Sequence, residues 1–354
     1  MASAETRRVT GPEDVTPEWL GAVLHRAEPE SVLTGITRTE LTRGRLGRCV
    51  RFGLSWDGPG GPAAVVGKFP AAGPVSRQTG TIGNQYATEV EFYRTLGERV
   101  CVDVPRCHAA EAHDDGGFVL ILDWVDGAVG DQAAGATLPE AETAVDALAR
   151  LHAQFSGSAE LPPPPGAAEH RRTAALYQLL CDRFLDRFGD RLSAAAAATV
   201  ARFKRSVRGW TALWEPPFTL LHGDYRLDNL LFRTVRGHRR VTVLDWQTLS
   251  AGPGPKDLAY LLGGSLDPDL RRSHEAALVD RYVRTLRAHG TAVPDGWLHR
   301  TLRLGTLSGM HMTVVGSMLV ESGTDADRMF AAMAERHAAH AADHDALRLL
   351  ESMC

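Results

Sequence analysis

The chain of 354 residues is long enough to form two lobes or domains, each with an apolar core of its own. Its formal net charge of −4 argues against a general nucleic-acid-binding protein, because such proteins are normally basic. The sequence has no apolar run that could span a bilayer and no hydrophobic signal core at its N-terminus. We therefore expect a cytoplasmic protein with neither a nucleic-acid nor a membrane partner.

The N-terminal region begins with a predicted helix at Thr16–Leu20 and continues with two predicted strands, Val32–Glu40 and Cys49–Trp56. The stretch between these strands carries Gly44 and Gly47. A glycine-bearing turn can bind nucleotide phosphates through its backbone N–H groups, and it can equally be a simple hairpin turn. Both glycines are therefore candidate nucleotide contacts.

Lysine is scarce in this chain, since only three of the 39 basic residues are lysines. A lysine that persists among arginines marks a place where a compact point charge is needed. Lys68 stands near the end of a predicted buried strand, Ala63–Pro70. A predicted helix follows at Asn84–Arg99, and its Glu89 and Glu91 are the candidates to pair with Lys68.

Two further strands are predicted at Val104–Ala109 and Gly117–Val125, after which the chain becomes mostly helical. Helical periodicity is found in six stretches: 138–155, 167–190, 193–213, 269–290, 295–320 and 324–350. The five cysteines are scattered, without metal-binding or disulfide spacing, so we expect reduced thiols.

Two short runs in the C-terminal half carry the chemistry, and each follows an apolar, strand-like approach. The first, Leu220–Phe232, contains Asp224 and, five residues later, Asn229; the second, Val241–Gln247, contains Asp245. Mg²⁺ prefers carboxylate and carboxamide oxygens, and an acceptor hydroxyl needs a nearby carboxylate to orient it and take its proton. The spacing therefore predicts a phosphoryl-transfer site with Asp224 as base and with Asn229 and Asp245 as magnesium ligands.

The run His222–Asp224, followed by Asn229 and by the Asp-Trp-Gln run at Asp245–Gln247, resembles the aminoglycoside phosphotransferase-like branch of the protein-kinase fold. The Asp-Trp-Gln ending is similar to the ecdysteroid-kinase-like subgroup. The resemblance implies an α+β, bilobal fold. A small β-rich nucleotide-binding lobe with one key helix would cover 1–123, and a larger, mainly helical catalytic and substrate-binding lobe would cover 124–354.

The same resemblance implies the nucleotide contacts. Lys68 would touch the α- and β-phosphates, and the Glu-x-x-Phe-Tyr pattern of related chains selects Glu89, not Glu91, as its partner. The adenine would bind the backbone around Leu122 to Trp124, where relatives usually have Glu-Asp in place of this chain's Leu-Asp. ATP is the expected nucleotide, and GTP stays open as an alternative.

Several neighbours are expected to support the site. The resemblance implies that Asp257 buttresses the catalytic loop and that His152 packs structurally. Arg226 could assist with phosphate or substrate charge, Asp228 could brace the loop, and His222 could form an internal hydrogen bond.

The chain lacks an Asp-Phe-Gly motif and a long activation segment, which argues against a protein substrate. We therefore predict an ATP- and Mg²⁺-dependent O-phosphotransferase that acts on a small-molecule alcohol, such as an antibiotic or a natural-product intermediate. A role in resistance, biosynthesis or catabolism stays open, as does the oligomeric state. The alternatives are a pseudokinase-like module that binds nucleotide or metabolite without turnover and a protein kinase.

The acceptor is not identified by the sequence. An aminoglycoside would favour an acidic pocket, for which Glu321–Asp327 offers acids, and a sterol-like or acyl alcohol would favour an apolar pocket, which Leu302–Val320 could line. His337, His340 and His344 share a predicted helical face at a spacing that can hold zinc, although a polar helix face is the simpler interpretation.

Overall fold

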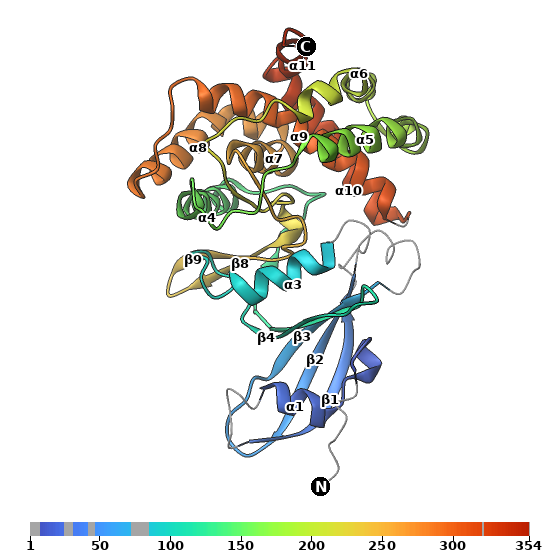
Figure 1. The fold of residues 1–354 in the computed structure, drawn as a ribbon, viewed down its shortest axis with the longest axis vertical. Coiled ribbons are helices and arrows are strands. Elements are labelled where there is room, and N and C mark those ends of the chain that lie inside the picture. Colours follow the sequence, from blue (N-terminus) through green and yellow to red (C-terminus); the bar gives the residue numbers. More distant parts are fainter. Residues whose placement is uncertain (1–7, 25–30, 42–46, 72–84, 321, 354) are drawn as a thin grey trace. The chain divides into compact units, whose positions relative to one another are not determined.

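The fold is known from a computed structural model, which describes residues 8–24, 31–41, 47–71, 85–320 and 322–353. The chain divides into two compact units. Unit 1 comprises Met1–Arg99, Val104–Asp126 and Asp245–Gln247, and unit 2 comprises Val100–Asp103, Gly127–Leu244 and Thr248–Cys354. A β-sheet dominates the first and helices dominate the second, so the predicted α+β fold class is confirmed (Figure 1).

Unit 1 is built on a five-stranded antiparallel sheet. In spatial order its strands are β1 (Val32–Leu41), β2 (Gly47–Asp57), β3 (Ala64–Pro70), β5 (Phe118–Asp123) and β4 (Cys107–Ala112). The short helix α1 (Pro17–Leu24) contacts β1, and α3 (Gln85–Thr95) lies along β4 and β5 (Figure 1). The apolar faces of these strands and of α1 form the core, in which Phe52, Val65 and Ile121 are fully buried.

The strand predicted at Val104–Ala109 begins later than expected, since β4 starts at Cys107. Pro105 explains the difference, because proline has no N–H to donate to a strand ladder. The other predicted strands of unit 1 match the observed ones closely.

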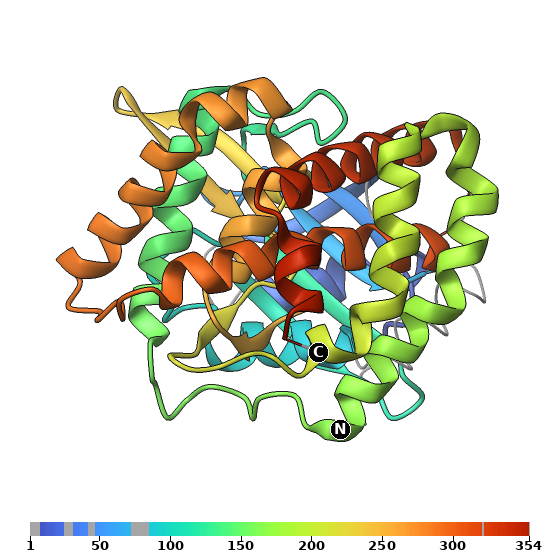
Figure 2. The same cartoon turned by 90° about the horizontal axis from the view of Figure 1, so that it is seen from above.

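Unit 2 is mainly helical. Its helices are α4 (Leu138–Phe155), α5 (Ala167–Phe188), α6 (Ala194–Thr211), α7 (Pro255–Ser265), α8 (Pro268–Ala288), α9 (Trp297–Leu319), α10 (Thr324–Asp343) and α11 (Ala346–Glu351). Viewed from above, α5 and α6 lie side by side, as do α4 and α8 (Figure 2). Of these helices, α7 packs against α9, α10, α4 and α8.

Short strands of unit 2 hold the segment that carries the sequence motifs. They form two small sheets, one of β7 (Thr219–Leu221) with β10 (Ser250–Gly252) and one of β6 (Ala128–Val129), β8 (Leu230–Val235) and β9 (His238–Val243). Between β7 and β8 lies an eight-residue loop, here called the catalytic loop, 222–229. Strand pairing on both sides fixes the two ends of this loop.

The single helix predicted at 324–350 is wrong, because the structure has two helices there, α10 and α11. Asp345 separates them and has a left-handed backbone, with φ of 50°. A residue in this conformation interrupts the helical hydrogen-bond ladder, and aspartate tolerates it better than most residues. In the described part of the chain, no helix combines the length and the apolar character needed to cross a membrane.

Candidate active site

Gly223 lets the catalytic loop turn directly after β7. Its φ is +81°, and a Cβ added there would lie 2.4 Å from the backbone oxygen of Thr248. A side chain is therefore excluded by both conformation and space. Glycine at this position lets the loop lie against the segment that precedes β10. Asp224 is the next residue of this closely packed turn.

Asp224 is held by hydrogen bonds to both of its carboxylate oxygens. The Tyr260 hydroxyl donates to Oδ1 at 2.7 Å, and the Asn229 amide donates to Oδ2 at 3.0 Å. The Arg226 guanidinium pairs with the same carboxylate at 3.0 Å and with Asp228 at 2.8 Å. The Asp224 side chain is 14% exposed, so it is fixed in place and still accessible.

Tyr260 remains a donor at neutral pH. Burial and the charge of Asp224 raise the pKa of its hydroxyl well above the ordinary value. Tyr260 was not among the site residues predicted from the sequence. Its position three residues after Asp257 in α7 was the available signal, because such residues lie on one face of a helix.

Asn229 ends a 3₁₀ turn, Leu227–Asn229, and is buried. Its side-chain nitrogen donates to the backbone oxygen of Asp224 at 2.9 Å as well as to the carboxylate. These two bonds use both amide hydrogens, which leaves the side-chain oxygen as the group available to a metal. The backbone oxygen of Asn229 accepts a hydrogen bond from the N–H of Leu244 at 2.9 Å. Leu244 is the residue directly before Asp245 in the sequence.

Asp257, in the first turn of α7, holds the start of the catalytic loop. Its carboxylate accepts from the backbone N–H of His222 at 2.7 Å and of Gly223 at 3.3 Å. Burial opposes its charge, but His152 and His222 keep the pKa of Asp257 below the usual value. These are the contacts expected of a residue that buttresses the loop.

Three further residues, His152, His222 and Asp228, were expected to support the catalytic loop and its surroundings. His152 is buried and hydrogen-bonds Tyr282 at 2.9 Å, which is a packed structural arrangement. The His222 ring hydrogen-bonds the Leu244 oxygen at 2.9 Å, as predicted. Asp228 accepts from the Gln132 backbone N–H at 3.3 Å, and the Gln132 side chain accepts from Leu227 N–H at 2.8 Å. This buried glutamine fixes the loop from the segment before α4, and it was not among the residues predicted from the sequence.

A second group of charged residues lies within unit 1. The Lys68 ammonium contacts Glu89 at 2.5 Å and Asp245 at 2.8 Å. Glu89 is 1% exposed and also accepts from Trp246 N–H at 3.3 Å, whereas Glu91 is exposed. Burial opposes the charge on Lys68, but Asp245 and Glu89 together raise its pKa well above the ordinary value. The predicted Lys68–Glu89 pair is therefore present.

Asp245 has a strained backbone, with φ of 64°, which is uncommon outside glycine. The next residue, Trp246, is fully buried and stacks on Phe92 of α3 with ring centres 4.0 Å apart and an interplanar angle of 8°. The indole thereby fixes the run to α3, the helix that carries Glu89. This packing aims the Asp245 carboxylate at Lys68.

The remaining predicted nucleotide contacts lie in or beside the sheet, except Gly44, which is outside the described residues. Gly47 opens β2, and a Cβ there would lie 2.9 Å from the Phe69 oxygen and 3.7 Å from Lys68 Cε. Leu122 is buried in β5. Trp124 lies just after β5 and is covered by the Arg51 guanidinium, 4.9 Å from the ring centre.

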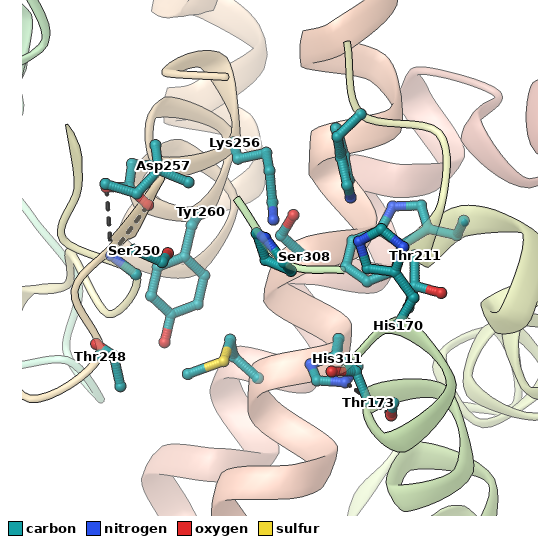
Figure 3. Close-up of a pocket in the computed structure, with 16 residues that line it drawn as sticks. His170, Thr173, Thr211, Thr248, Ser250, Lys256, Asp257, Tyr260, Ser308 and His311 are labelled. Atoms are coloured by element: carbon teal, nitrogen blue, oxygen red, sulfur yellow. Dashed lines mark hydrogen bonds between the residues drawn. The ribbon is translucent and has the colours of Figure 1, made fainter. Parts of the chain in front are cut away.

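A pocket of about 210 Å³ opens beside the catalytic loop within unit 2 (Figure 3). On the loop side it is lined by Gly223, Thr248 and Tyr260. The rest of its wall includes aromatic and polar residues of α5, α6, α7 and α9 and the segment after α6, among them His170, Trp210, Trp214, Lys256, Ser308 and His311. Because Tyr260 lines this pocket and bonds Asp224, the pocket adjoins the candidate base.

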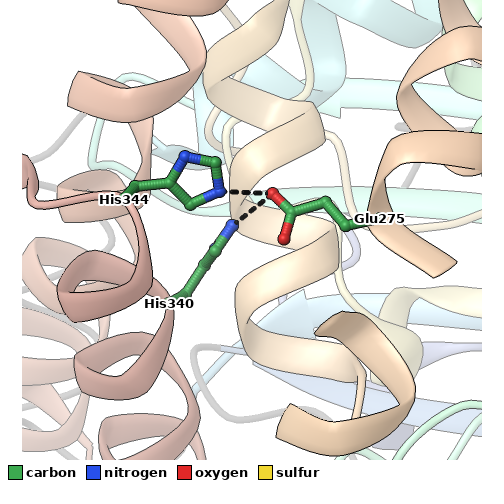
Figure 4. A group of neighbouring side chains, drawn as sticks. All are labelled: Glu275, His340 and His344. Atoms are coloured by element: carbon green, nitrogen blue, oxygen red, sulfur yellow. Dashed lines mark hydrogen bonds and ion pairs between the residues drawn. The ribbon is translucent and has the colours of Figure 1, made fainter. Parts of the chain in front are cut away.

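The three histidines of the possible zinc site do not act as one group. His340 and His344 each donate a ring N–H to the same oxygen of Glu275 in α8, at 3.0 and 2.5 Å (Figure 4). His337 instead stacks on Tyr260, with ring centres 5.4 Å apart. The other Glu275 oxygen pairs with Arg271 at 2.5 Å. The cluster is thus a hydrogen-bonded tie between α8 and the C-terminal end of α10.

Residues 83–297 match the sequence model of a family described as the phosphotransferase enzyme family. No curated protein matches the chain at a significant level. Among solved structures, a microcompartment-associated aminopropanol kinase is similar with a TM-score of 0.55, at 15% identity over 94% of this chain and 98% of that chain.

Two other kinases of known structure share the fold. An ethanolamine kinase from Plasmodium vivax has a TM-score of 0.52, at 11% identity over 98% of this chain and 87% of its own. The amicoumacin kinase hAmiN, in complex with AMP-PNP, Ca²⁺ and Ami, has a TM-score of 0.53, at 13% identity over 86% of this chain and 90% of its own. At these identities the likeness establishes a common fold.

Proposed function

The chain belongs to the phosphotransferase enzyme family, and we propose that it moves the γ-phosphate of ATP to a hydroxyl group of a small molecule. The arrangement around Asp224 carries this proposal. An ionised carboxylate offers about four acceptor sites, and Tyr260, Arg226 and Asn229 use three of them. One site remains for an incoming hydroxyl, which Asp224 would orient and deprotonate.

Asn229 and Asp245 are the proposed magnesium ligands. Magnesium is a hard ion that binds oxygen, and the pair offers one carboxamide oxygen and one carboxylate. When bound, the ion would neutralise charge that develops on the transferred phosphoryl group. The chain's own contribution is to fix the ligands, through the 3₁₀ turn at Asn229 and the stacking of Trp246 on Phe92.

Lys68 is the proposed contact to the nucleotide phosphates. Its ammonium has three hydrogens, of which Glu89 and Asp245 take two. The third is free to reach a phosphate oxygen, and burial strengthens that contact because the local dielectric is low. ATP is the proposed nucleotide, and GTP belongs in the same test, because similar structures were solved with AMP-PNP in one case and with GDP in others.

The test is a transfer assay by mass spectrometry, with ATP or GTP, Mg²⁺ and a panel of hydroxylated small molecules. Asp224→Asn should abolish product while Mg²⁺-dependent nucleotide binding, followed by calorimetry, stays within about twofold of the native protein. Asp190→Asn, an exposed aspartate, is the matched control. Full activity in Asp224→Asn would refute the role of this residue, and nucleotide binding without product from any acceptor would favour a binding module.

A further inference from the structure

The three lysines of the chain have different surroundings. Lys68 pairs with two carboxylates, and Lys204 pairs with Asp182 at 2.7 Å. Lys256 has no carboxylate and no hydrogen-bond acceptor for its ammonium among the described residues; it lies over the rings of Trp210 and Trp214, at 5.6 and 4.6 Å. It is half-buried, whereas all other residues of α7 are fully buried.

Lys256 points into the pocket beside the catalytic loop, whereas Asp257, the next residue of α7, points to the loop (Figure 3). Burial lowers the pKa of the Lys256 ammonium to about 8, against a smaller opposite effect of Asp257. Ser308 lines the same pocket, and its buried hydroxyl has no hydrogen-bond partner within the described part of the chain. Two polar groups of this wall thus lack a partner that an anion would provide.

On the assumption that the proposed phosphotransfer is correct, we propose that this pocket binds the acceptor through a carboxylate, held by Lys256 and Ser308. The acceptor class is then a small hydroxy acid with an apolar or aromatic body. Trp210 and Trp214 supply a surface for that body, and Tyr260 joins the pocket to Asp224.

The charges that face the pocket support an anionic acceptor over a polycationic one. Among the described residues of its wall, Asp257 is the one carboxylate, and the catalytic loop occupies it through two backbone N–H groups. His311 is neutral at pH 7, because burial lowers its pKa to about 4, and Tyr260 stays protonated. The remaining titratable group of the wall is His170, which could only add positive charge. A polycation therefore meets no free carboxylate here.

In the acidic region considered for an aminoglycoside, the described carboxylates have arginine partners, and Asp325 contacts Arg328 at 3.6 Å. Asp327 pairs with Arg187 and with Arg191, the latter at 3.5 Å. Glu321 lies outside the described residues. The volume points the same way, since about 210 Å³ is below the range of about 300–1,000 Å³ that is common for drug-sized ligands. A small acceptor fits this space better than a compound of several rings.

The first experiment observes the pocket without catalysis. Reductive methylation with ¹³C-formaldehyde labels lysines and keeps their charge, and a chain with three lysines gives few NMR signals. Lys256→Arg assigns the Lys256 signal. Titration with tropate, a hydroxy acid with a phenyl ring, should shift this signal and raise its titration midpoint above about 8. The methyl ester of tropate and kanamycin should leave it unchanged.

The second experiment measures transfer with a library divided into anionic, neutral and cationic alcohols. Phosphorylated acceptors should carry a carboxylate, and Lys256→Met should raise their KM roughly 10- to 100-fold with a smaller change in kcat. KM should also rise as pH passes about 8 in the native protein and stay flat in Lys256→Met. Lys204→Met is the matched control, because this lysine is paired at the surface.

The two proposals fail in different ways. Acceptors that are neutral or cationic, with KM unaffected in Lys256→Met, would overturn the carboxylate pocket and leave the phosphotransferase intact. A Lys256 signal that responds to no anionic compound of the library would overturn it as well. A signal that responds to hydroxy acids, without product from any acceptor, would support the pocket and count against the proposed reaction.

Discussion

Glu89→Gln tests how unit 1 holds its buried lysine. The substitution keeps the shape of the side chain and an oxygen for Trp246 N–H, and it removes the charge that lies 2.5 Å from the Lys68 ammonium. Breaking a buried ion pair costs about 3–5 kcal/mol when the remaining charge is left alone. Here Asp245 still pairs with Lys68 at 2.8 Å, so we expect the range for one charge-assisted hydrogen bond, about 1.5–3 kcal/mol.

The loss should be local, because a chain of two units need not unfold in one step. Hydrogen exchange in peptides that cover β3 and α3 reports on unit 1, and urea unfolding reports on the whole chain. Glu91→Gln is the matched control, since Glu91 lies on the same helix and is exposed. It should change stability by less than about 0.5 kcal/mol. Equal exchange rates in the two variants would refute the reasoning.

The same variant separates nucleotide from acceptor binding. Glu89 acts through Lys68, so it is a positioning residue and its loss should raise KM for ATP about tenfold, with KM for the acceptor unchanged. A rise confined to the acceptor would contradict the assignment of Lys68 to the nucleotide.

Three further outcomes are expected. Gly223→Ala should destabilise the protein by about 1–3 kcal/mol in urea unfolding, because the added Cβ would lie 2.4 Å from the Thr248 oxygen. It should also abolish transfer while nucleotide binding, measured by calorimetry, is kept; normal turnover would contradict this. Asp257→Asn should lower kcat more than 100-fold in the transfer assay, because the new amide N–H₂ group would face a backbone N–H of the catalytic loop that now donates to the carboxylate. An unchanged kcat would exclude a buttressing role. The free energy of unfolding should fall as pH drops from about 6.5 to 4. Burial lowers the pKa of His340 to about 4 in the folded chain, so in this range the imidazole is protonated in the unfolded chain and still neutral in the folded one. Urea midpoints that stay level from about pH 6.5 to 4.5 would contradict this expectation for His340. Glu275 acts in the same direction below about pH 4.5, since burial opposes its charge but His340 and His344 hold its pKa below the ordinary value; midpoints that stay level in that lower range would contradict its role.

Most of the fold follows from local patterns in the sequence. Strand alternation and helical periodicity placed most elements, although α7, β6 and β10 were not predicted. The motif at 222–229 with the run at 245–247 predicted the family that the match over 83–297 confirms. The break at Asp345 was not predictable, because the apolar periodicity continues through it and only the backbone dihedral reveals the end of α10.

The partners of charged residues were predictable only where a motif supplied them. Lys68 and Glu89 were paired through a family pattern, whereas Gln132 and Tyr260 were not found. Both reach the catalytic loop from segments distant in the sequence; for Tyr260 the helical spacing from Asp257 was the one available signal, and for Gln132 there was none. Lys256 is similar, because its lack of a carboxylate partner is a property of the surrounding helices rather than of its neighbours in the chain.

Three residues of the first turns of α7 serve different parts of the site. Asp257 holds the start of the catalytic loop, Tyr260 bonds Asp224, and Lys256 faces the pocket. Because the other residues of α7 are buried, the position of this helix is fixed by packing, and the proposed base and the proposed acceptor pocket are then fixed relative to one another within unit 2. A substitution at 256 can therefore alter which acceptor binds without moving Asp257 or Tyr260. Acceptor preference in this chain should follow the charge at that single position more closely than it follows any change in the catalytic loop.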